Sequence, residues 1–306
     1  MSKTLFLSGI VKLTFVIVIQ VGFWYAYHNL NHRREDDDKS CFFDVDGTLI
    51  SHKNNVVLES TRIALNLLEK RGIKRIISTG RHMVELEELP VNNIEFDAYI
   101  TLNGQLCLDS QRNIILENPI DGFEKECLIK LFKEKTIPIM LVEKDRMYIN
   151  YIDRQVEIAQ QAISTSVPEI KEYTGNEIYQ VIAFIEAGAE NLLGQKLTNC
   201  KITRWNDYAV DIIAATGGKT AGVKAYLKAN NFEKEETMAF GDGDNDIEML
   251  KYVQIGVAMG NAGCEVKANA DYITDSVDND GIMKALISLN ICEKPDRDVK
   301  PDRDGV

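Results

Sequence analysis

Apolar residues follow two different periods along most of this chain, and the two periods alternate. The segment CFFDVDGTLI, from Cys41, starts as a short apolar strand. Residues 58–71 are typical of a helix, because their apolar side chains fall on one face, and Gly72 is placed to end it. IKRIISTG and AYITLNG then predict a second and a third strand. This order and spacing indicate a parallel, doubly wound sheet.

The pattern changes over residues 121–204. There, the predicted helices FEKECLIKLFKEK and DRQVEIAQQAIST mix with the predicted strands IPIMLVE, RMYINY, IYQVIAFIE and KITRW, which indicates a separate α+β unit. The strand–helix alternation then returns with YAVDIIA, TMAFGD, IGVAM and DYIT. We therefore predict an α/β fold: a Rossmann-like, doubly wound sheet formed by residues 41–120 and 205–291, split by an inserted α+β domain.

The two ends of the chain differ from the rest. Residues 5–27 are almost all apolar and long enough to cross a bilayer as a helix, so residues 1–40 predict a hydrophobic membrane anchor and a polar linker. A signal peptide, a mis-assigned start before a soluble cytoplasmic protein and a buried core helix stay open as alternatives. Arg33 and Arg34 favour a cytoplasmic position for the domain after the span. Residues 292–306 repeat KPDRD and predict a disordered charged tail.

Composition narrows the possible functions. Hydrophobic residues make up 45% and charged residues 27% of the 306 residues, which is ordinary for a globular protein. The formal net charge of -12 argues against a nucleic-acid partner, because an acidic chain repels phosphate backbones. An acidic protein with an anionic substrate needs local cations, such as a divalent metal and a placed Lys or Arg. The six cysteines are widely spaced, which favours free thiols in a reducing compartment.

Two acidic motifs follow apolar strands directly. Asp44 and Asp46 in DVDGT face the same side of an extended chain, at a strand end where ligands bind in open α/β sheets. GDGDND places three carboxylates within 242–246. Such clusters repel unless a cation lies among them, and oxygen ligands suit Mg²⁺. A solvated turn is the alternative for the first motif, and Val253 at the twelfth loop position excludes an EF-hand for the second.

Two shorter motifs also lie at the ends of predicted strands. In STGR, the Thr79 hydroxyl and a tight glycine turn can hold a phosphate oxygen. Lys219 in GGKT lies between a strand and a helix, where it is either a functional cation or a surface lysine. A Walker A loop is excluded, because Ile213 stands where its first glycine is required.

In this order, DxDGT, STGR, a lysine and GDGxND resemble the haloacid dehalogenase-like superfamily, and within it the Cof-like type IIB phosphatases. TLNG, AMGNA and ADYIT also look like that family. The resemblance covers about 41–291, with 121–204 similar in layout to a cap of type C2B. It implies a Mg²⁺-dependent phosphatase that hydrolyses small phosphate monoesters through an aspartyl-phosphate. Sugar phosphates are the first expected substrates, and flavin or other cofactor phosphates the next.

The resemblance also implies a role for each motif residue. Asp44 would be the nucleophile, and Asp46 would protonate the leaving alcohol and then activate water. The side chains of Asp44 and Asp242, with the backbone carbonyl of Asp46, would bind Mg²⁺. The remaining implied roles are phosphate binding by Thr79, Lys219 and Asn245, support of the metal ligands by Asp246, and a dispensable variable position at Asp244.

Other functions stay open at this point. Ion-pumping ATPases of the superfamily carry Thr at the position of Asp46, whereas an acid there favours rapid turnover. A phosphomutase carries both acids, so it remains an alternative, as does a catalytically silent phosphate-binding module on a membrane. No protein partner is predicted. We expect surface or core roles, rather than substrate contacts, for His52, Trp205, Tyr148 and Tyr151.

Overall fold

The computed structural model describes residues 40–163 and 165–293. The predicted anchor at 5–27, its linker and residues 294–306 of the predicted tail lie outside these ranges. Among the helices that the structure describes, none combines the length and the apolar character that a bilayer crossing requires. The described strands all belong to one compact unit, Asp38–Ala285.

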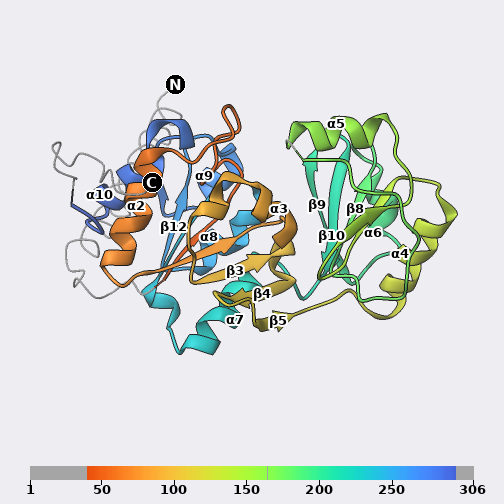
Figure 1. The fold of residues 1–306 in the computed structure, drawn as a ribbon, viewed down its shortest axis with the longest axis horizontal. Coiled ribbons are helices and arrows are strands. Elements are labelled where there is room, and N and C mark those ends of the chain that lie inside the picture. Colours follow the sequence, from red (N-terminus) through yellow and green to blue (C-terminus); the bar gives the residue numbers. More distant parts are fainter. Residues whose placement is uncertain (1–39, 164, 294–306) are drawn as a thin grey trace, which may run out of the picture. The chain divides into compact units, whose positions relative to one another are not determined.

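The first sheet confirms the predicted doubly wound core. Its order in the described part of the chain is β13-β12-β11-β1-β2-β3-β4-β5, and the neighbours from β13 to β3 are parallel (Figure 1). The bounds are Ser40–Phe43 (β1), Lys74–Ser78 (β2), Ala98–Thr101 (β3), Leu106–Asp109 (β4), Ile114–Glu117 (β5), Thr237–Gly241 (β11), Ile255–Ala258 (β12) and Tyr272–Ile273 (β13). The strands β4 and β5 form an antiparallel hairpin that the sequence did not predict.

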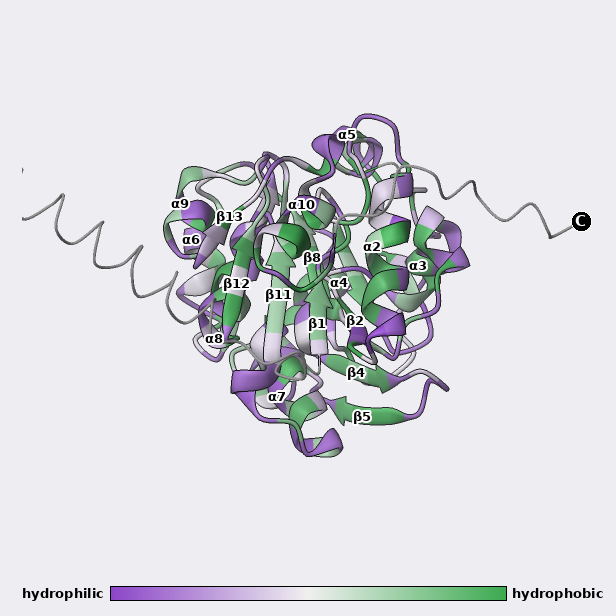
Figure 2. Ribbon diagram, turned by 90° about the vertical axis from the view of Figure 1, so that its left-hand side faces the viewer, coloured by the Kyte–Doolittle hydropathy of each residue, from purple (hydrophilic) through white to green (hydrophobic). Residues whose placement is uncertain are grey.

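Helices lie between and after these strands along the chain. They are α2 (Glu59–Lys70), α3 (Met83–Glu88), α7 (Lys219–Asn230), α8 (Ile247–Tyr252), α9 (Cys264–Ala268) and α10 (Gly281–Ser288). Every residue of β1 is buried, as expected for a central parallel strand, and the neighbouring strands are coloured as hydrophobic in Figure 2. Phe42 of β1 packs with Val223 of α7 and Leu250 of α8 in one apolar cluster. The core is therefore built between the sheet and these two helices.

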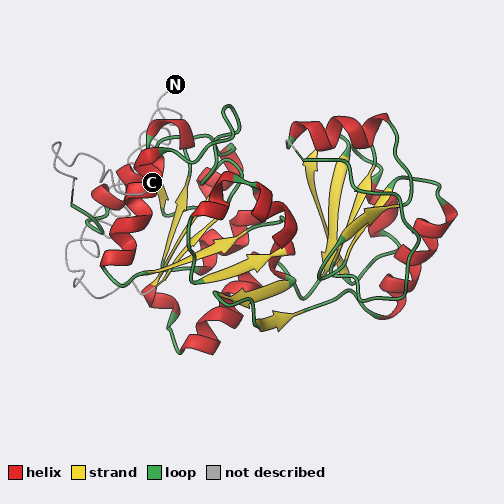
Figure 3. Ribbon diagram, viewed as in Figure 1, coloured by secondary structure: helices red, strands yellow, loops and turns green. Residues whose placement is uncertain are grey.

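A second, antiparallel sheet has the order β7-β6-β8-β10-β9 (Figure 3). Its strands are β6 (Ile139–Val142), β7 (Met147–Ile149), β8 (Gln180–Phe184), β9 (Cys200–Asn206) and β10 (Ala209–Ala214), and its helices are α4 (Gly122–Glu134), α5 (Arg154–Ala162) and α6 (Glu190–Gly194). We call residues 121–214 the cap. The predicted boundary at 204 is wrong, because YAVDIIA forms β10 and pairs with β8 and β9, so the core resumes only at α7.

The two faces of the cap sheet pack differently, because side chains alternate along a strand. Leu141 of β6 faces the α4 side, where it packs with Phe132. Met140 and Val142 face the other way and join a cluster with residues of α5. The same cluster includes three leucines of the core, Leu102, Leu106 and Leu108. Apolar packing therefore connects the cap with the first sheet.

The closeness of α7 to β3 gives a test of the core. A Cβ at Gly222 would lie 2.3 Å from Cγ2 of Ile100, a stiff β-branched side chain in a buried strand. We expect Gly222→Ala to lower the free energy of unfolding by about 1–3 kcal/mol, because overpacking outweighs the helix propensity that alanine adds. Urea unfolding measures this, with Lys228→Ala on the exposed side of α7 as the control. Unchanged or higher stability would contradict the packing.

Candidate active site

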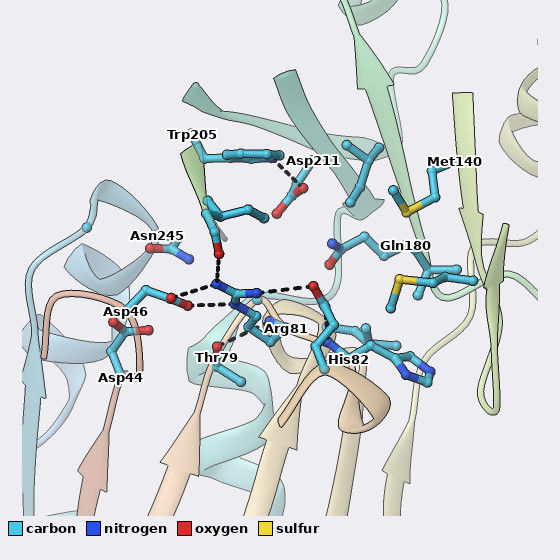
Figure 4. A pocket seen from close by; sticks show the side chains of 18 of the residues that line it. Asp44, Asp46, Thr79, Arg81, His82, Met140, Gln180, Trp205, Asp211 and Asn245 are labelled. Atoms are coloured by element: carbon cyan, nitrogen blue, oxygen red, sulfur yellow. Dashed lines mark hydrogen bonds and ion pairs between the residues drawn. The ribbon is translucent and has the colours of Figure 1, made fainter. Parts of the chain in front are cut away.

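The predicted site residues converge at one edge of the first sheet. Asp44 follows β1, Thr79 follows β2 and Asp242 follows β11, and these three parallel strands are neighbours. Their carboxyl ends therefore meet, as expected for the ligand site of an open α/β sheet. They open into a cavity of about 250 Å³ whose lining comes from both the core and the cap (Figure 4).

A buried lysine lies behind the two acidic motifs. Nζ of Lys219 lies 2.6 Å from Oδ1 of Asp44 and 2.6 Å from Oδ1 of Asp246. Burial lowers the pKa of this ammonium group, but the charges of Asp246 and Asp44 outweigh burial and raise it. Lys219 is therefore a buried cation of the site, and the surface-lysine alternative is wrong.

The carboxylates exceed the charge that one lysine can neutralise. Burial raises the pKa of Asp44 well above its usual range, against the attraction of Lys219, and the other nearby carboxylates raise it further. Burial, followed by the charge of Asp246, raises the pKa of Asp242 to about 7. One oxygen each from Asp44, Asp242 and Asp246 lies within 4.8 Å of the others. Hard oxygen donors with surplus negative charge are the chemistry that a divalent cation needs, so the residues present fit one.

The carboxylate oxygens of Asp246 are nevertheless largely occupied by hydrogen bonds within the protein. Its Oδ1 bonds Lys219, and its Oδ2 accepts the backbone N–H groups of Asp242 and Gly243 at 3.0 and 2.9 Å. These bonds hold the turn after β11 in shape. Asn245 extends from the same turn into the cavity lining, whereas Asp244 is exposed and does not line it.

The turn after β1 is fitted closely around Asp242. Gly47 has φ +80°, and a Cβ there would lie 2.2 Å from Oδ2 of Asp242. Thr48 donates from Oγ1 to Oδ1 of Asp242 at 3.3 Å, and Nδ2 of Asn261 donates to Oδ2 at 2.8 Å and to the Gly47 carbonyl at 2.9 Å. Asn261 belongs to the AMGNA motif, for which sequence reasoning predicted no role.

Asp46 makes a two-pronged ion pair with Arg81. Nε and Nη2 of Arg81 donate to the two carboxylate oxygens at 2.8 and 2.7 Å (Figure 4). The same guanidinium donates to the Ile163 carbonyl at 3.1 Å and to Oγ1 of Thr165 at 2.6 Å, both in the cap. Burial lowers the pKa of Arg81, but Asp46 and Glu85 outweigh burial and raise it. Arg81 was visible in STGR, yet only its contacts show that it joins Asp46 to the cap.

Asn103 of the TLNG motif joins the turn after β11 to the cap. Its Oδ1 accepts from Nδ2 of Asn245 at 2.9 Å. Its own Nδ2 donates to Oδ2 of Asp211 at 2.8 Å and to Oε1 of Gln180 at 3.1 Å. Sequence reasoning missed Asn103, Asp211 and Gln180, although TLNG itself was visible as a motif.

The cap supplies most of the apolar wall of the cavity. Its apolar lining residues are Met140, Val142, Met147, Ile163 and Ile182. Trp205 also lines the cavity and donates from Nε1 to Oδ1 of Asp211 at 2.9 Å. His52 also lines it from the core and is exposed, in keeping with the expected surface role, and the expectation that neither Trp205 nor His52 contacts the substrate stays a prediction. Tyr148, by contrast, is a buried core residue.

Asp211 gives a pH test of this wall. Burial is the main cause that raises the pKa of Asp211, from 3.8 to about 7. Between about pH 4 and pH 7 the folded state keeps this proton while the unfolded state loses it, so the stability from Asp211 falls as pH rises. We expect Asp211→Asn to flatten that fall, as measured by urea unfolding at a series of pH values in one divalent-cation buffer. An equally steep fall in wild type and variant would contradict this account.

Most of this chain is similar to known proteins. The family model of haloacid dehalogenase-like hydrolases matches residues 41–286. YkrA of Bacillus subtilis, whose name gives phosphatase as a provisional activity, is 33% identical over 262 residues, which cover 83% of this chain and 99% of YkrA. The 5-amino-6-(5-phospho-D-ribitylamino)uracil phosphatase YcsE of the same organism is 30% identical over 259 residues, which cover 83% of this chain and 97% of YcsE.

A solved structure is similar over the same region. It is that of a subclass IIB sugar phosphatase of the superfamily, with a TM-score of 0.75, 33% identity, and coverage of 83% of this chain and all of that one (100%). The chain therefore belongs to the haloacid dehalogenase-like hydrolases and, within them, to the subclass IIB phosphatases.

Proposed function

We propose that the protein hydrolyses phosphate monoesters of small metabolites through an aspartyl-phosphate on Asp44, with Mg²⁺ as its cofactor. The observation that carries the proposal is the position of Asp44 at the base of a cavity, bonded to Lys219 and surrounded by further carboxylates. A carboxylate beside a fixed cation suits attack on phosphorus, because the phosphoryl group brings negative charge that must be offset.

The first half of the reaction transfers the phosphoryl group to the enzyme. A carboxylate oxygen of Asp44 forms a bond to phosphorus as the bond between phosphorus and the ester oxygen breaks. Asp46, two residues along at the same strand end, gives a proton to that oxygen, so the leaving group departs as an alcohol. Arg81 donates to both oxygens of Asp46 in this structure. One of these bonds is given up when that oxygen carries the proton, and the other fixes the direction in which the carboxyl group points.

The second half returns Asp44 to its starting state. Asp46 takes a proton from water, the water oxygen bonds to phosphorus, and the bond between phosphorus and Asp44 breaks to release inorganic phosphate. Asp44 and Asp242, with the backbone carbonyl of Asp46, would hold Mg²⁺, and the ion supplies positive charge that offsets the charge of the phosphoryl oxygens. No other residue needs to change its protonation state.

Three groups are placed to hold the phosphoryl oxygens. Thr79 accepts the Arg81 backbone N–H at its hydroxyl oxygen, so the hydroxyl hydrogen is free to donate to phosphate. Lys219 reaches the nucleophile itself, so its charge lies beside the phosphorus that Asp44 attacks. Asn245 lines the cavity with its amide oriented by Asn103. These contacts support phosphate binding at the base of the cavity.

The substrate class is supported by two similar proteins. One is named as a sugar phosphatase, and the other as a phosphatase of a phosphorylated ribitylamino-uracil. Both leaving groups are polyhydroxy alcohols, so we propose sugar phosphates or related cofactor-precursor phosphates as substrates. A phosphomutase would return an isomerised phosphate ester instead of inorganic phosphate, and product analysis distinguishes the two.

Replacing the nucleophile tests the mechanism directly. Asp44→Asn should lower kcat by at least about a hundredfold, because an amide is a far poorer nucleophile of nearly the same shape. Release of inorganic phosphate from p-nitrophenyl phosphate measures the loss, and circular dichroism checks that the fold persists. Asp244→Asn, at the exposed acidic position of the same site region, should keep full activity. Activity of Asp44→Asn above about a hundredth of wild type would remove Asp44 from this role.

The metal requirement is a separate test. Exhaustive chelation should abolish phosphatase activity, and Mg²⁺ should restore it, because the carboxylate surplus needs a compact divalent cation. Ca²⁺ should compete with Mg²⁺ and inhibit, since its larger and looser coordination does not hold the phosphoryl group in the same place. A titration with each ion after chelation measures this, and full activity of the chelated enzyme would refute the metal assignment.

A further inference from the structure

We infer that the cap side of the cavity selects an uncharged or cationic leaving group that donates hydrogen bonds to Asp211 and Gln160, and that it rejects leaving groups with a second anionic group. The inference rests on the proposed phosphatase function and names the kind of alcohol that the site releases. Three observations support it: a buried side-chain oxygen of Gln160 without a hydrogen-bond partner, the Asp211 carboxylate, and the charges of the residues that line the cavity.

The first observation is Gln160 on α5. Its side chain is 3% exposed and lines the cavity, yet its Oε1 has no hydrogen-bond partner among the described residues. Buried polar atoms in folded proteins are nearly always hydrogen-bonded, and leaving one unpaired costs about 1–3 kcal/mol. Because Gln160 itself lines the cavity, a ligand that donates to this oxygen would satisfy it.

The second observation is Asp211 on β10. Each of its oxygens accepts one bond from the protein, Oδ1 from Trp205 and Oδ2 from Asn103. A carboxylate offers about four acceptor positions, so roughly two remain for a ligand. The two protein bonds, of which Figure 4 shows the one from Trp205, fix the orientation of the carboxylate in the cavity lining. Asp211 is thus a second acceptor that is already in place.

The charge of the wall decides which ligands these acceptors admit. Arg81 is the sole Lys or Arg among the described residues that line the cavity, and it is committed to Asp46, Glu85 and the cap. A second phosphate or a carboxylate on the leaving group would meet Asp211 and Glu85 without a free cation. Like charges brought together in a partly enclosed cavity disfavour binding.

The rest of the wall fits the carbon side of the same ligand. The cap adds apolar side chains to the lining of the same cavity, and Trp205 offers only its ring, because its one donor is used by Asp211. A polyol or amino-polyol has hydroxyl or amine donors and C–H groups that pack on such a ring. The wall therefore matches the neutral or amine-bearing alcohols and not their acids.

A matched pair of esters tests the selection. Sorbitol 6-phosphate and 6-phosphogluconate differ at one carbon, which carries a hydroxymethyl group in the first and a carboxylate in the second. With the full-length, Mg²⁺-loaded enzyme at about pH 8.5, above the pKa of about 7 of Asp211, we expect kcat/KM for the first to exceed that for the second by about tenfold or more. Asp211→Asn should reduce this ratio to within about threefold, because it removes the repelling charge.

Gln160→Met tests the unpaired oxygen with a variant of similar size. It should lower kcat/KM on sorbitol 6-phosphate by about fivefold more than on p-nitrophenyl phosphate, whose leaving group donates no hydrogen bond from its far side. Gln161→Met, on the exposed side of the same helix, is the matched control and should change neither value.

The outcomes separate this inference from the proposed function. If wild type does not hydrolyse p-nitrophenyl phosphate, the phosphatase proposal fails and the inference falls with it. If it does, then equal use of the two matched esters, or a Gln160→Met effect of the same size on both substrates, overturns the inference alone. If sorbitol 6-phosphate is neither cleaved nor able to compete with p-nitrophenyl phosphate, the inference is overturned as well.

Discussion

The Lys219 ammonium lies between two buried carboxylates that could not be buried together without it. Its partners, Asp44 and Asp246, are 175 and 27 residues away along the chain, so one cation connects β1, α7 and the turn after β11. Taking a charge out of water costs several kcal/mol, and removing one partner of a buried pair leaves the other uncompensated. The geometry of Asp44, the proposed nucleophile, and the integrity of this part of the fold therefore depend on the same contact.

The position of Lys219 also depends on a turn after β3 with an unusual backbone conformation. Leu102 and Asn103 both have φ 53°, and such a conformation in a non-glycine residue costs about 1–3 kcal/mol unless its surroundings hold it. The backbone of Asn103 bonds Thr79 and Gly218, and a Cβ at Gly104 would lie 2.1 Å from the Gly218 carbonyl oxygen. The turn thus fixes the start of α7, from which Lys219 extends, while the Asn103 side chain reaches the cap.

The catalytic half of the site could be predicted from the sequence because it follows from chain direction. Apolar runs that end in polar motifs are strands whose carboxyl ends meet in a parallel sheet, so Asp44, Thr79 and Asp242 had to converge. Which strands pair with one another, by contrast, depends on residues far apart in the sequence. YAVDIIA is an apolar run of strand length in either sheet, and only the hairpin from β9 assigns it to the cap, which is why the predicted boundary at 204 failed. The β4–β5 hairpin is missed for the same reason.

The recognition half could not be predicted, because it depends on where the cap lies over the core. Trp205 gives no sign of function in the sequence, but the pairing of β9 with β10 places Asp211 opposite Thr203. Trp205 lies at an irregularity in this pairing, between Arg204 and Asn206, and its Nε1 reaches Asp211. Gln160 reaches the same cavity from α5, a segment with no motif of its own.

The base of the cavity and its cap side differ in the charge of the ligand group that each can bind. At its base, Lys219 and the place for a divalent cation offset the charge of a phosphoryl group, although the surrounding side chains are acidic. At the cap wall, Asp211 and Gln160 are acceptors with no free cation beside them among the described lining residues. Under the proposed function, a substrate with one phosphate would therefore bind with the phosphate at Asp44 and the uncharged end under the cap. Asp211 on β10 would then orient the ester for attack as well as select its alcohol.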